Sequence, residues 1–206
     1  MSGTARTRRA KLMERCRPRP EKARELWTRN KGFGKLPGTM SQDRLQQSQS
    51  PGGPHHFLSR LVGGWEGVAR TWFEPDKLGD ESPITGTIRS VLDGRFVVHE
   101  YTSSLGGKPL SGLATLGHHL DGRHFTMSWV DSFHMGSDIM TLLGEAGVSD
   151  RFSVLGSYFT GETTPRWGWR VDIEQPDPDS LVITHFNIQP DEAPQKAIEI
   201  QYRRRA

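Results

Sequence analysis

Apolar and polar residues alternate along most of the chain after residue 63, in short segments rich in β-branched and aromatic side chains. This alternation is typical of β-strands that bury one face. Gly, Pro and Asp interrupt the segments at regular intervals, as at Asp93-Gly94 and Gly106-Gly107, where tight turns favour these residues. The pattern predicts ten strands, over residues 64–73, 83–92, 95–104, 110–119, 123–131, 137–145, 151–159, 166–175, 180–188 and 196–205.

The connections between these strands are short, so neighbouring strands should pair as antiparallel hairpins. Ten strands in such a meander favour a closed up-and-down barrel, which leaves no exposed edge. Residues 54–62 have the pattern of a short amphipathic helix, followed by Gly63, Gly64 and Trp65. The expected fold is therefore an all-β domain over residues 51–206, with a short N-terminal helix.

The alternation also assigns inward faces. Inward on their strands are Phe125, Met127, Trp129 and Asp131; Trp167, Trp169, Val171 and Ile173; and Trp65, Gly67, Ala69 and Thr71. The small residues after Trp65 would leave volume in the barrel interior, which suits a ligand cavity; a small, tightly filled barrel is the alternative. An interior volume below about 300 Å³ with a fully apolar lining would disfavour a ligand.

Charge is distributed unevenly. Thirteen of the 27 lysines and arginines and four of the 24 acidic residues lie in residues 1–50, a surplus of nine positive charges. The remaining 14 basic and 20 acidic residues leave a deficit of six. We interpret residues 1–50 as a disordered basic extension and expect no nucleic-acid partner. Translation from Met40 instead of Met1 is a further hypothesis.

The cysteine content and the lack of long apolar runs bear on the cellular location of the protein. Cys16 is the single cysteine, so no disulfide forms within one chain. No run of about 18 apolar residues occurs, and the N-terminus lacks the apolar core of a signal peptide. We expect a cytoplasmic protein without a membrane partner.

Several motifs together resemble one bacterial family. They are LVGGWEG (61–67), TWFEP (71–75), LDGRFVVHEY (92–101), WVDSFHMG (129–136), WGWR (167–170) and EIQYRRR (199–205). Over about 150 residues, from His55 to Arg205, the chain is similar to domain of unknown function 1579, a family with a calycin-like, lipocalin-like barrel. The resemblance implies this fold and no established activity. It also implies a structural role for Trp65, which in calycin relatives packs against an arginine of the last strand. Arg204 is the matching residue, and their cation–π contact would close one end of the barrel.

Asp131 and His134 are the candidate catalytic residues. Asp131 ends a strand and His134 follows three residues later, so the pair could orient a substrate, relay a proton or ligate a metal. The alternative is that Asp131 bonds the amides of its own turn while His134 lies on the surface. Some members of the similar family share the WVDSFHMG motif.

Glu100 is expected to point inward with Phe96 and Val98, which would place His99 outside. A carboxylate there would pair with Arg89 or Arg170, or have a raised pKa; a structural ion pair between strands is the alternative. The candidate ligand-binding residues are Glu100, Phe125, Met127, Trp129, Trp167 and Trp169. Aromatic residues of this kind also form barrel cores.

The eight histidines do not indicate a metal site. His55-His56 and His118-His119 are adjacent pairs, whose side chains diverge on a strand, and neither an HxH pair nor an HExxH motif occurs. His185 lies on a late strand, where some barrel relatives carry a haem-binding histidine, but no haem signature surrounds it. We therefore expect no metal and no cofactor.

Three functions remain open. The first is binding of a small, largely apolar ligand in the barrel, with Trp129, Asp131, His134 and Glu100 at the polar end of its cavity. The second is an enzyme that uses Asp131 and His134 as an acid–base pair on a small molecule. The third is a non-catalytic interaction or dimerisation module with a filled barrel, for which a homodimer is one expected partner.

Overall fold

Ten strands follow two short helices in the computed structural model, which describes residues 38–134, 136–161 and 165–206. The helices are α3 (Gly38–Gln49) and α4 (Pro54–Arg60). The strands are β1 (Gly63–Glu74), β2 (Lys77–Val91), β3 (Phe96–Leu105), β4 (Lys108–His119), β5 (His124–Asp131), β6 (Met140–Gly144), β7 (Phe152–Tyr158), β8 (Trp167–Asp177), β9 (Ser180–Ile188) and β10 (Gln195–Arg204).

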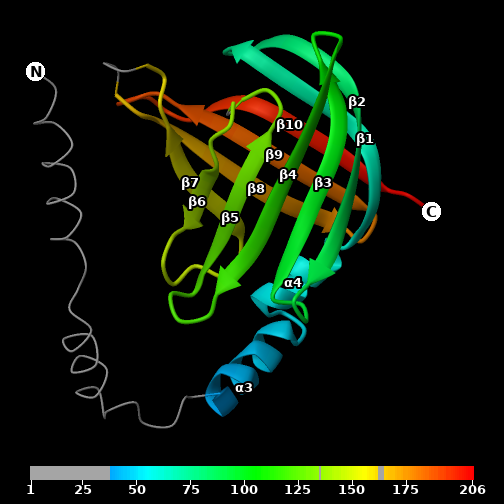
Figure 1. Ribbon diagram of the computed structural model, residues 1–206, viewed down its shortest axis with the longest axis vertical. Coiled ribbons are helices and arrows are strands. Elements are labelled where there is room, and N and C mark those ends of the chain that lie inside the picture. The colour runs from blue at the N-terminus through cyan, green and yellow to red at the C-terminus, as the bar shows by residue number, and fades with distance from the viewer. Residues whose placement is uncertain (1–37, 135, 162–164) are drawn as a thin grey trace, which may run out of the picture. The chain divides into compact units, whose positions relative to one another are not determined.

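Each strand pairs with its sequence neighbours in antiparallel fashion, and β1 also pairs with β10, so the sheet closes into an up-and-down barrel (Figure 1). The ten predicted strands and their order are confirmed. The largest difference is at β2, which begins at Lys77 instead of residue 83. Residues 77–82 are almost entirely polar, so they carry no apolar alternation, yet they pair with the end of β1 through Glu74↔Lys77.

The predicted turns have the backbone geometry that their residues favour. Gly106 and Gly107 both adopt positive φ, 57° and 76°, between β3 and β4. Two consecutive positive φ angles define the type I′ turn, whose twist matches the strands that it joins. The β2–β3 connection is less well matched, because Leu92 adopts a φ of 52° without the freedom of glycine.

Helix α4 lies at one end of the barrel, here called the helix end (Figure 1). Leu58 and Leu61 are buried there against Trp65, whose indole Nε1–H donates to the Leu61 carbonyl at 2.8 Å. The guanidinium carbon of Arg204 lies 4.3 Å from the centroid of the Trp65 ring. The predicted helix is thus confirmed, ending two residues early, and the predicted Trp65–Arg204 pair is present.

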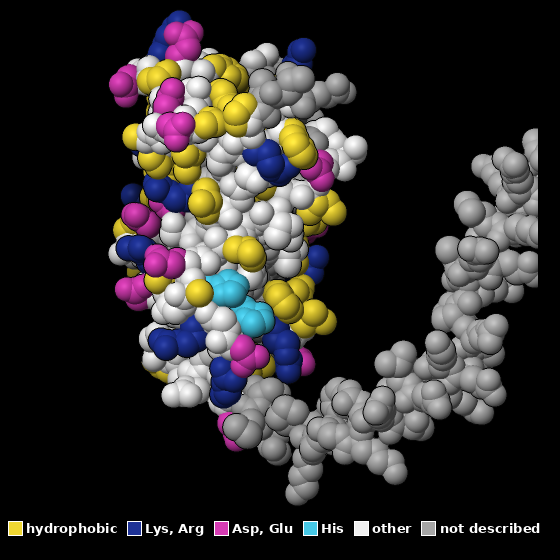
Figure 2. Space-filling model, turned by 90° about the vertical axis from the view of Figure 1, so that its left-hand side faces the viewer, with side chains coloured by type: hydrophobic (Ala, Val, Ile, Leu, Met, Phe, Trp, Pro, Cys, Tyr) yellow, Lys and Arg dark blue, Asp and Glu magenta, His cyan; other side chains and the backbone are white. Residues whose placement is uncertain are grey.

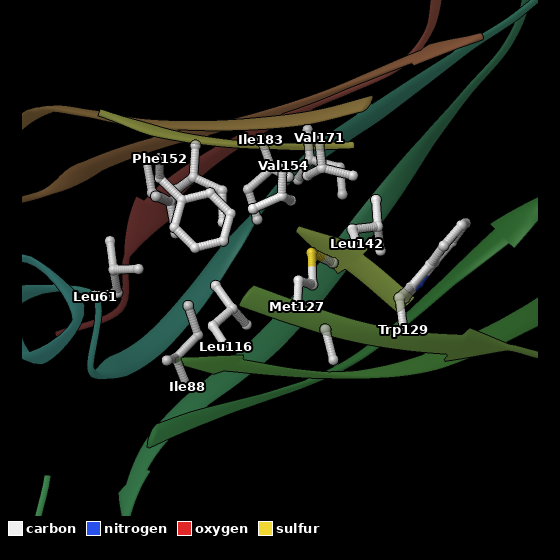
Figure 3. Packing of buried hydrophobic residues seen from close by; sticks show 14 of the residues in the cluster. Leu61, Ile88, Leu116, Met127, Trp129, Leu142, Phe152, Val154, Val171 and Ile183 are labelled. Carbon is white, nitrogen blue, oxygen red and sulfur yellow. The ribbon is translucent and has the colours of Figure 1, made fainter. Parts of the chain in front are cut away.

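Beyond the helix end, the barrel interior is filled by the side chains of alternate strand residues (Figure 3). The buried residues include Ile88, Leu116, Met127, Leu142, Phe152, Val154, Val171 and Ile183. The inward faces predicted for β5 and β8 are correct: Phe125, Met127, Trp129 and Asp131 are buried, as are Trp169, Val171 and Ile173. Trp167, at the start of β8, is half-buried.

Part of the expected extension is folded, which corrects the sequence-based prediction of disorder for Gly38–Gln49. Helix α3 has almost no apolar stripe, so the pattern does not reveal it. Its one leucine, Leu45, is buried, and polar contacts also hold the helix. Arg44 pairs with Asp121 at 2.5 Å, and Ser48 Oγ lies 2.6 Å from His55 Nδ1. Residues 1–37 lie outside the described residues, so the prediction of disorder there and the Met40 start stay predictions. No described helix has the length and apolar character needed to span a membrane.

Candidate functional site

A layer of polar side chains crosses the barrel interior between the helix end and the opposite end, here called the far end. This polar layer consists of His99 and Tyr101 from β3, Asp131 from β5, His185 from β9 and Tyr202 from β10. His99, Asp131, His185 and Tyr202 are buried, and Tyr101 packs against the core. Buried polar groups are costly unless they form hydrogen bonds, so their partners matter.

Hydrogen bonds link this layer to two tryptophans. Trp129 Nε1–H donates to the Tyr101 oxygen at 2.9 Å, and Trp169 Nε1–H donates to His185 Nδ1 at 3.1 Å. The two indoles stack, with their centroids 5.7 Å apart. His99 Nε2 lies 3.2 Å from the Tyr202 oxygen. Each tryptophan thus fixes the orientation of one polar group of the layer.

Both oxygens of the Asp131 carboxylate form hydrogen bonds with His134. Its Oδ1 accepts the backbone N–H groups of Phe133 at 3.0 Å and His134 at 2.6 Å, and its Oδ2 lies 2.5 Å from His134 Nδ1. The Asp131 side chain is 1% exposed and that of His134 is 20% exposed. Asp131 therefore bonds the amides of its own turn and also pairs with His134, which lines an inner cavity instead of lying on the surface.

The pKa values of these groups reflect burial first. Burial alone would raise the pKa of Asp131, but the hydrogen bonds and charge of His134 and the amide of Phe133 outweigh it, and that pKa is lowered. Burial lowers the pKa of His185 to about 3 and that of His99 to about 4. Burial also raises the pKa of Tyr101 well above its usual range. At neutral pH the imidazoles of His99 and His185 and the hydroxyl group of Tyr101 are therefore uncharged.

Two small inner cavities lie in this layer. The first has a volume of about 30 Å³ and is lined by Ala69, Thr71, Ile84, Tyr101, Ser103, Ser104, Leu105, Leu110, Trp129, Asp131, His134, His185, Ile198 and Ile200. The second, of about 20 Å³, is lined by His99, Tyr101, Ala114, Leu116, Met127, Trp129, Ile173, Ile183, His185 and Ile200. Since a water molecule needs about 10–15 Å³, each has room for one or two.

The interior is therefore fuller than the small residues of β1 predict, because tryptophan and tyrosine side chains of other strands occupy the space. The total lies below the limit of about 300 Å³ set above for a ligand cavity. The lining, however, is polar as well as apolar, so only one of the two conditions against a ligand is met.

A larger hollow, of about 640 Å³, lies over strands β2–β5 and contains outward residues such as Thr85, Thr102 and Leu113. It is shallow and open to solvent, and among its lining side chains only Tyr101 and Asp131 belong to the polar layer. We therefore place the candidate site at the inner cavities, where the buried titratable groups converge.

The inward orientation predicted for Glu100 is wrong. Glu100 is on the outer face, half exposed, with its Oε2 3.5 Å from Arg89 Nε. His99 points inward instead, because a neutral imidazole bonded to Tyr202 costs less to bury than an unpaired carboxylate. The alternative of an ion pair between strands is the one that the structure contains.

The other predicted ligand-binding residues divide into three groups. Trp129 and Met127 line an inner cavity, and Trp169 lies behind it, bonded to His185. Phe125 belongs to the core near the helix end, where it contacts Phe57 and Phe152. Trp167 lies beside Tyr158, with centroids 6.4 Å apart, outside both cavity linings.

Sequence reasoning missed the roles of His99, Tyr202 and His185 in the polar layer. His185 could have been found, because it alternates with Leu181 and Ile183 on β9. In the described part of the chain, no group of three or more His, Cys, Asp or Glu residues has an arrangement suited to a metal ion.

Comparisons with known proteins agree with this architecture. Residues 50–204 match the model of a family described as protein of unknown function, DUF1579. The chain belongs to the DUF1579 family. The family resemblance predicted from the motifs is thus confirmed. No curated protein matches the sequence.

Comparison with solved structures finds several that are similar to this DUF1579 chain. Rv2717c from M. tuberculosis has 15% identity and a TM-score of 0.50, covering 74% of this chain and 98% of that one. An S-type phycobiliprotein lyase, CPES, from Guillardia theta has 13% identity and a TM-score of 0.45, covering 73% and 92%. A designed fluorescence-activating β-barrel has 11% identity and a TM-score of 0.41, covering 72% and 96%. At this identity, the Rv2717c match shows a shared fold alone.

Proposed function

We propose that this DUF1579 protein binds a small, largely apolar ligand whose polar group enters the inner cavities. The observation that carries the proposal is the polar layer itself. Tyr101, Asp131 and His185 converge on cavities in an otherwise apolar interior. A barrel built only for stability would gain by replacing such groups with apolar side chains of the same size.

The cavity volumes limit what enters. About 30 Å³ accommodates a head group of a few atoms. The apolar body of the ligand would then lie toward the far end, where Leu105, Leu110 and Ile198 line the same cavity. Exposed hydrophobic side chains also occur on the connections at that end, among them Phe133, Ile139 and Phe159. Figure 2 shows hydrophobic side chains on the surface of this part of the molecule, interspersed with charged ones.

Native mass spectrometry of the full chain purified from its own host tests the proposal. We expect a mass excess from a retained small molecule, which extraction would then identify. A His185→Phe variant should lose it, whereas Glu100→Gln, on the outer face, should keep it. Recovery of apo protein alone, together with no ligand-induced change in the fluorescence of Trp129 and Trp169 across a library of small apolar compounds, would contradict the proposal.

A second function, acid–base catalysis, is favoured by the geometry of Asp131 and His134. Asp131 Oδ2 is 2.5 Å from His134 Nδ1, and both residues line the larger inner cavity. If Nδ1–H donates to the carboxylate, His134 Nε2 is free to take a proton from a bound molecule or water. The carboxylate would stabilise the imidazolium that results.

Hydrolysis of an activated ester such as p-nitrophenyl acetate tests this second function. General-base catalysis contributes about 10²–10⁴-fold, so His134→Gln should reduce the rate by that order. His119→Gln, a histidine on the outer face of β4, serves as the control. Equal rates for wild type and His134→Gln would contradict a catalytic role.

A further inference from the structure

The proton on His185 is fixed by its neighbour. An indole N–H is only ever a donor, so the contact of 3.1 Å with Trp169 requires that His185 Nδ1 be the acceptor. An uncharged imidazole carries one proton, which must then be on Nε2. Because His185 lines both inner cavities, it can present an N–H donor to them. A nitrogen that carries a proton is not a metal ligand.

Tyr101 presents a second donor by the same logic. Its phenolic oxygen accepts the indole N–H of Trp129 at 2.9 Å, which leaves the hydroxyl hydrogen free for an acceptor. Tyr101 also lines both inner cavities. Two tryptophans thus orient two neutral donors toward one small space.

The charges around this space exclude two classes of ligand. In the described linings of the inner cavities, no lysine or arginine occurs, and Asp131 is the only acidic residue. An anionic head group would be buried beside the Asp131 carboxylate, and His134, the imidazole of the lining nearest to it, is already paired with that carboxylate. A cationic head group would meet the N–H and O–H donors of His185 and Tyr101. The Asp131 carboxylate already accepts hydrogen bonds from two backbone amides and pairs with His134.

We infer that the ligand is uncharged and places a carbonyl or an equivalent acceptor oxygen between His185 Nε2–H and Tyr101 O–H. This inference rests on the proposed binding function and narrows its ligand class to neutral carbonyl compounds such as amides, ketones and aldehydes. It excludes carboxylates, including simple fatty acids, and amines.

Three compounds with the same alkyl chain and different head groups test this class: hexanamide, hexanoate and hexylamine. Binding to the full chain is followed by the indole ¹H–¹⁵N resonances of Trp129 and Trp169. An unpaired polar group in a buried site lowers the affinity by about fivefold to a hundredfold, so hexanamide should bind about tenfold tighter than the other two compounds. Hexanoate or hexylamine binding as tightly as hexanamide overturns the inference and leaves the proposed function intact.

The Trp169→Phe variant separates the role of the indole from a general loss of packing. It keeps an aromatic ring but frees His185 Nδ1, so the preference for hexanamide should fall to less than threefold. Trp167→Phe, on the same strand but with its ring beside Tyr158 instead of bonded to His185, should retain the preference. Retention of the preference in Trp169→Phe, with the variant folded by circular dichroism, would overturn the inference.

Two further measurements distinguish a failure of this inference from a failure of the proposed function. The ¹⁵N chemical shifts of the His185 ring should show a protonated Nε2 and an unprotonated Nδ1 in the wild type; the opposite tautomer overturns the inference alone. If none of the three compounds shifts a resonance at about 10 mM, where a ligand of about eight heavy atoms should be detected, the inference falls. The proposed function falls with it only if native mass spectrometry also finds no retained molecule.

Discussion

Removal of the Arg204 side chain should destabilise the barrel more than any other single surface substitution at the helix end. Its guanidinium donates to the carbonyls of Val62 at 2.6 Å, Pro178 at 2.9 Å and Arg60 at 3.0 Å, and it lies over the ring of Trp65. The carbonyls of Arg60 and Val62 lie at and just beyond the end of α4, where a cation is favourable. Arg204→Met keeps the aliphatic chain and loses all of these contacts.

The magnitude follows from the contacts and their exposure. Hydrogen bonds from a charged group contribute about 1.5–3 kcal/mol each, and a cation–π contact about 0.5–2 kcal/mol. The contacts share one side chain, which is 27% exposed, so they do not add fully. We expect a loss of about 3 kcal/mol for Arg204→Met. Arg204→Lys, which keeps the charge but not the planar fork, should lose about half as much.

Urea denaturation at neutral pH, followed by tryptophan fluorescence, measures this loss. For a urea m-value of about 2 kcal/mol/M, 3 kcal/mol lowers the midpoint by about 1.5 M. Arg203→Met is the matched control, because Arg203 is 75% exposed on the outer face, and it should cost less than about 1 kcal/mol. An Arg204→Met midpoint equal to that of Arg203→Met would refute the assignment of Arg204 to closure of the barrel.

Three further predictions concern stability. The folded pKa values of His99 and His185, about 4 and about 3, lie below the ordinary value of 6.5. The stability that these two neutral histidines contribute is therefore fully present above pH 6.5 and is lost as the pH falls toward 4, because the unfolded chain takes up the protons first. His99→Gln should reduce the dependence of the free energy of unfolding on pH by up to about 1.4 kcal/mol per pH unit. Urea titrations at pH 7, 6 and 5 measure it. Glu100→Gln should change the free energy of unfolding by less than about 0.5 kcal/mol in the same assay, because both members of its ion pair are half exposed. Leu92→Asn should increase the free energy of unfolding by about 0.5–1 kcal/mol and raise the melting temperature accordingly. Asparagine tolerates a φ of 52° better than leucine does, and the side chain is exposed.

Each of these predictions has a contrary outcome. A pH slope unchanged in His99→Gln would mean that His99 titrates normally in the folded chain. A loss above about 1 kcal/mol in Glu100→Gln would restore a buried role for that carboxylate. Leu113→Asn, at an extended position of β4, is the control for Leu92→Asn and should destabilise the barrel. Equal effects at the two positions would remove backbone strain as the explanation.

Strand order, turn positions and most inward faces are predictable from this sequence, because a half-buried strand must alternate and a closed meander leaves few alternatives. The exception at β3 has a physical cause. Val97 and Val98 are both buried although neighbouring residues of a strand point to opposite faces, so the alternation that should separate the two faces is hidden. Without it, His99 and Glu100 cannot be assigned to their faces from the pattern alone.

Of the candidate site, the sequence predicts the pairing of Asp131 with His134 but neither the rest of the polar layer nor the volume of the cavities. The spacing of Asp131 and His134 across a turn is enough to bring them together. The free space is set by side chains from β3, β5, β8 and β10 at once, so the small residues of β1 give no measure of it. The pairing of each indole N–H with a particular acceptor depends on strand register, which alternation within a single strand does not supply.

The pairing of β1 with β10 has a consequence for how the chain reaches this structure. Arg204, at the end of β10, donates to Val62, the residue before β1, across 142 residues of sequence, whereas every other strand pair is a local hairpin. Closing so long a loop should be the slow step of folding. The N–H of Arg205 also donates to the carbonyl of Gly64 at 2.9 Å, so the two ends of the barrel sequence are in contact. A circular permutant that joins these ends and opens the chain between Gly106 and Gly107 would turn that distant contact into a local hairpin and make β3 and β4 the distant pair, so the slow closing step should move from β1–β10 to β3–β4.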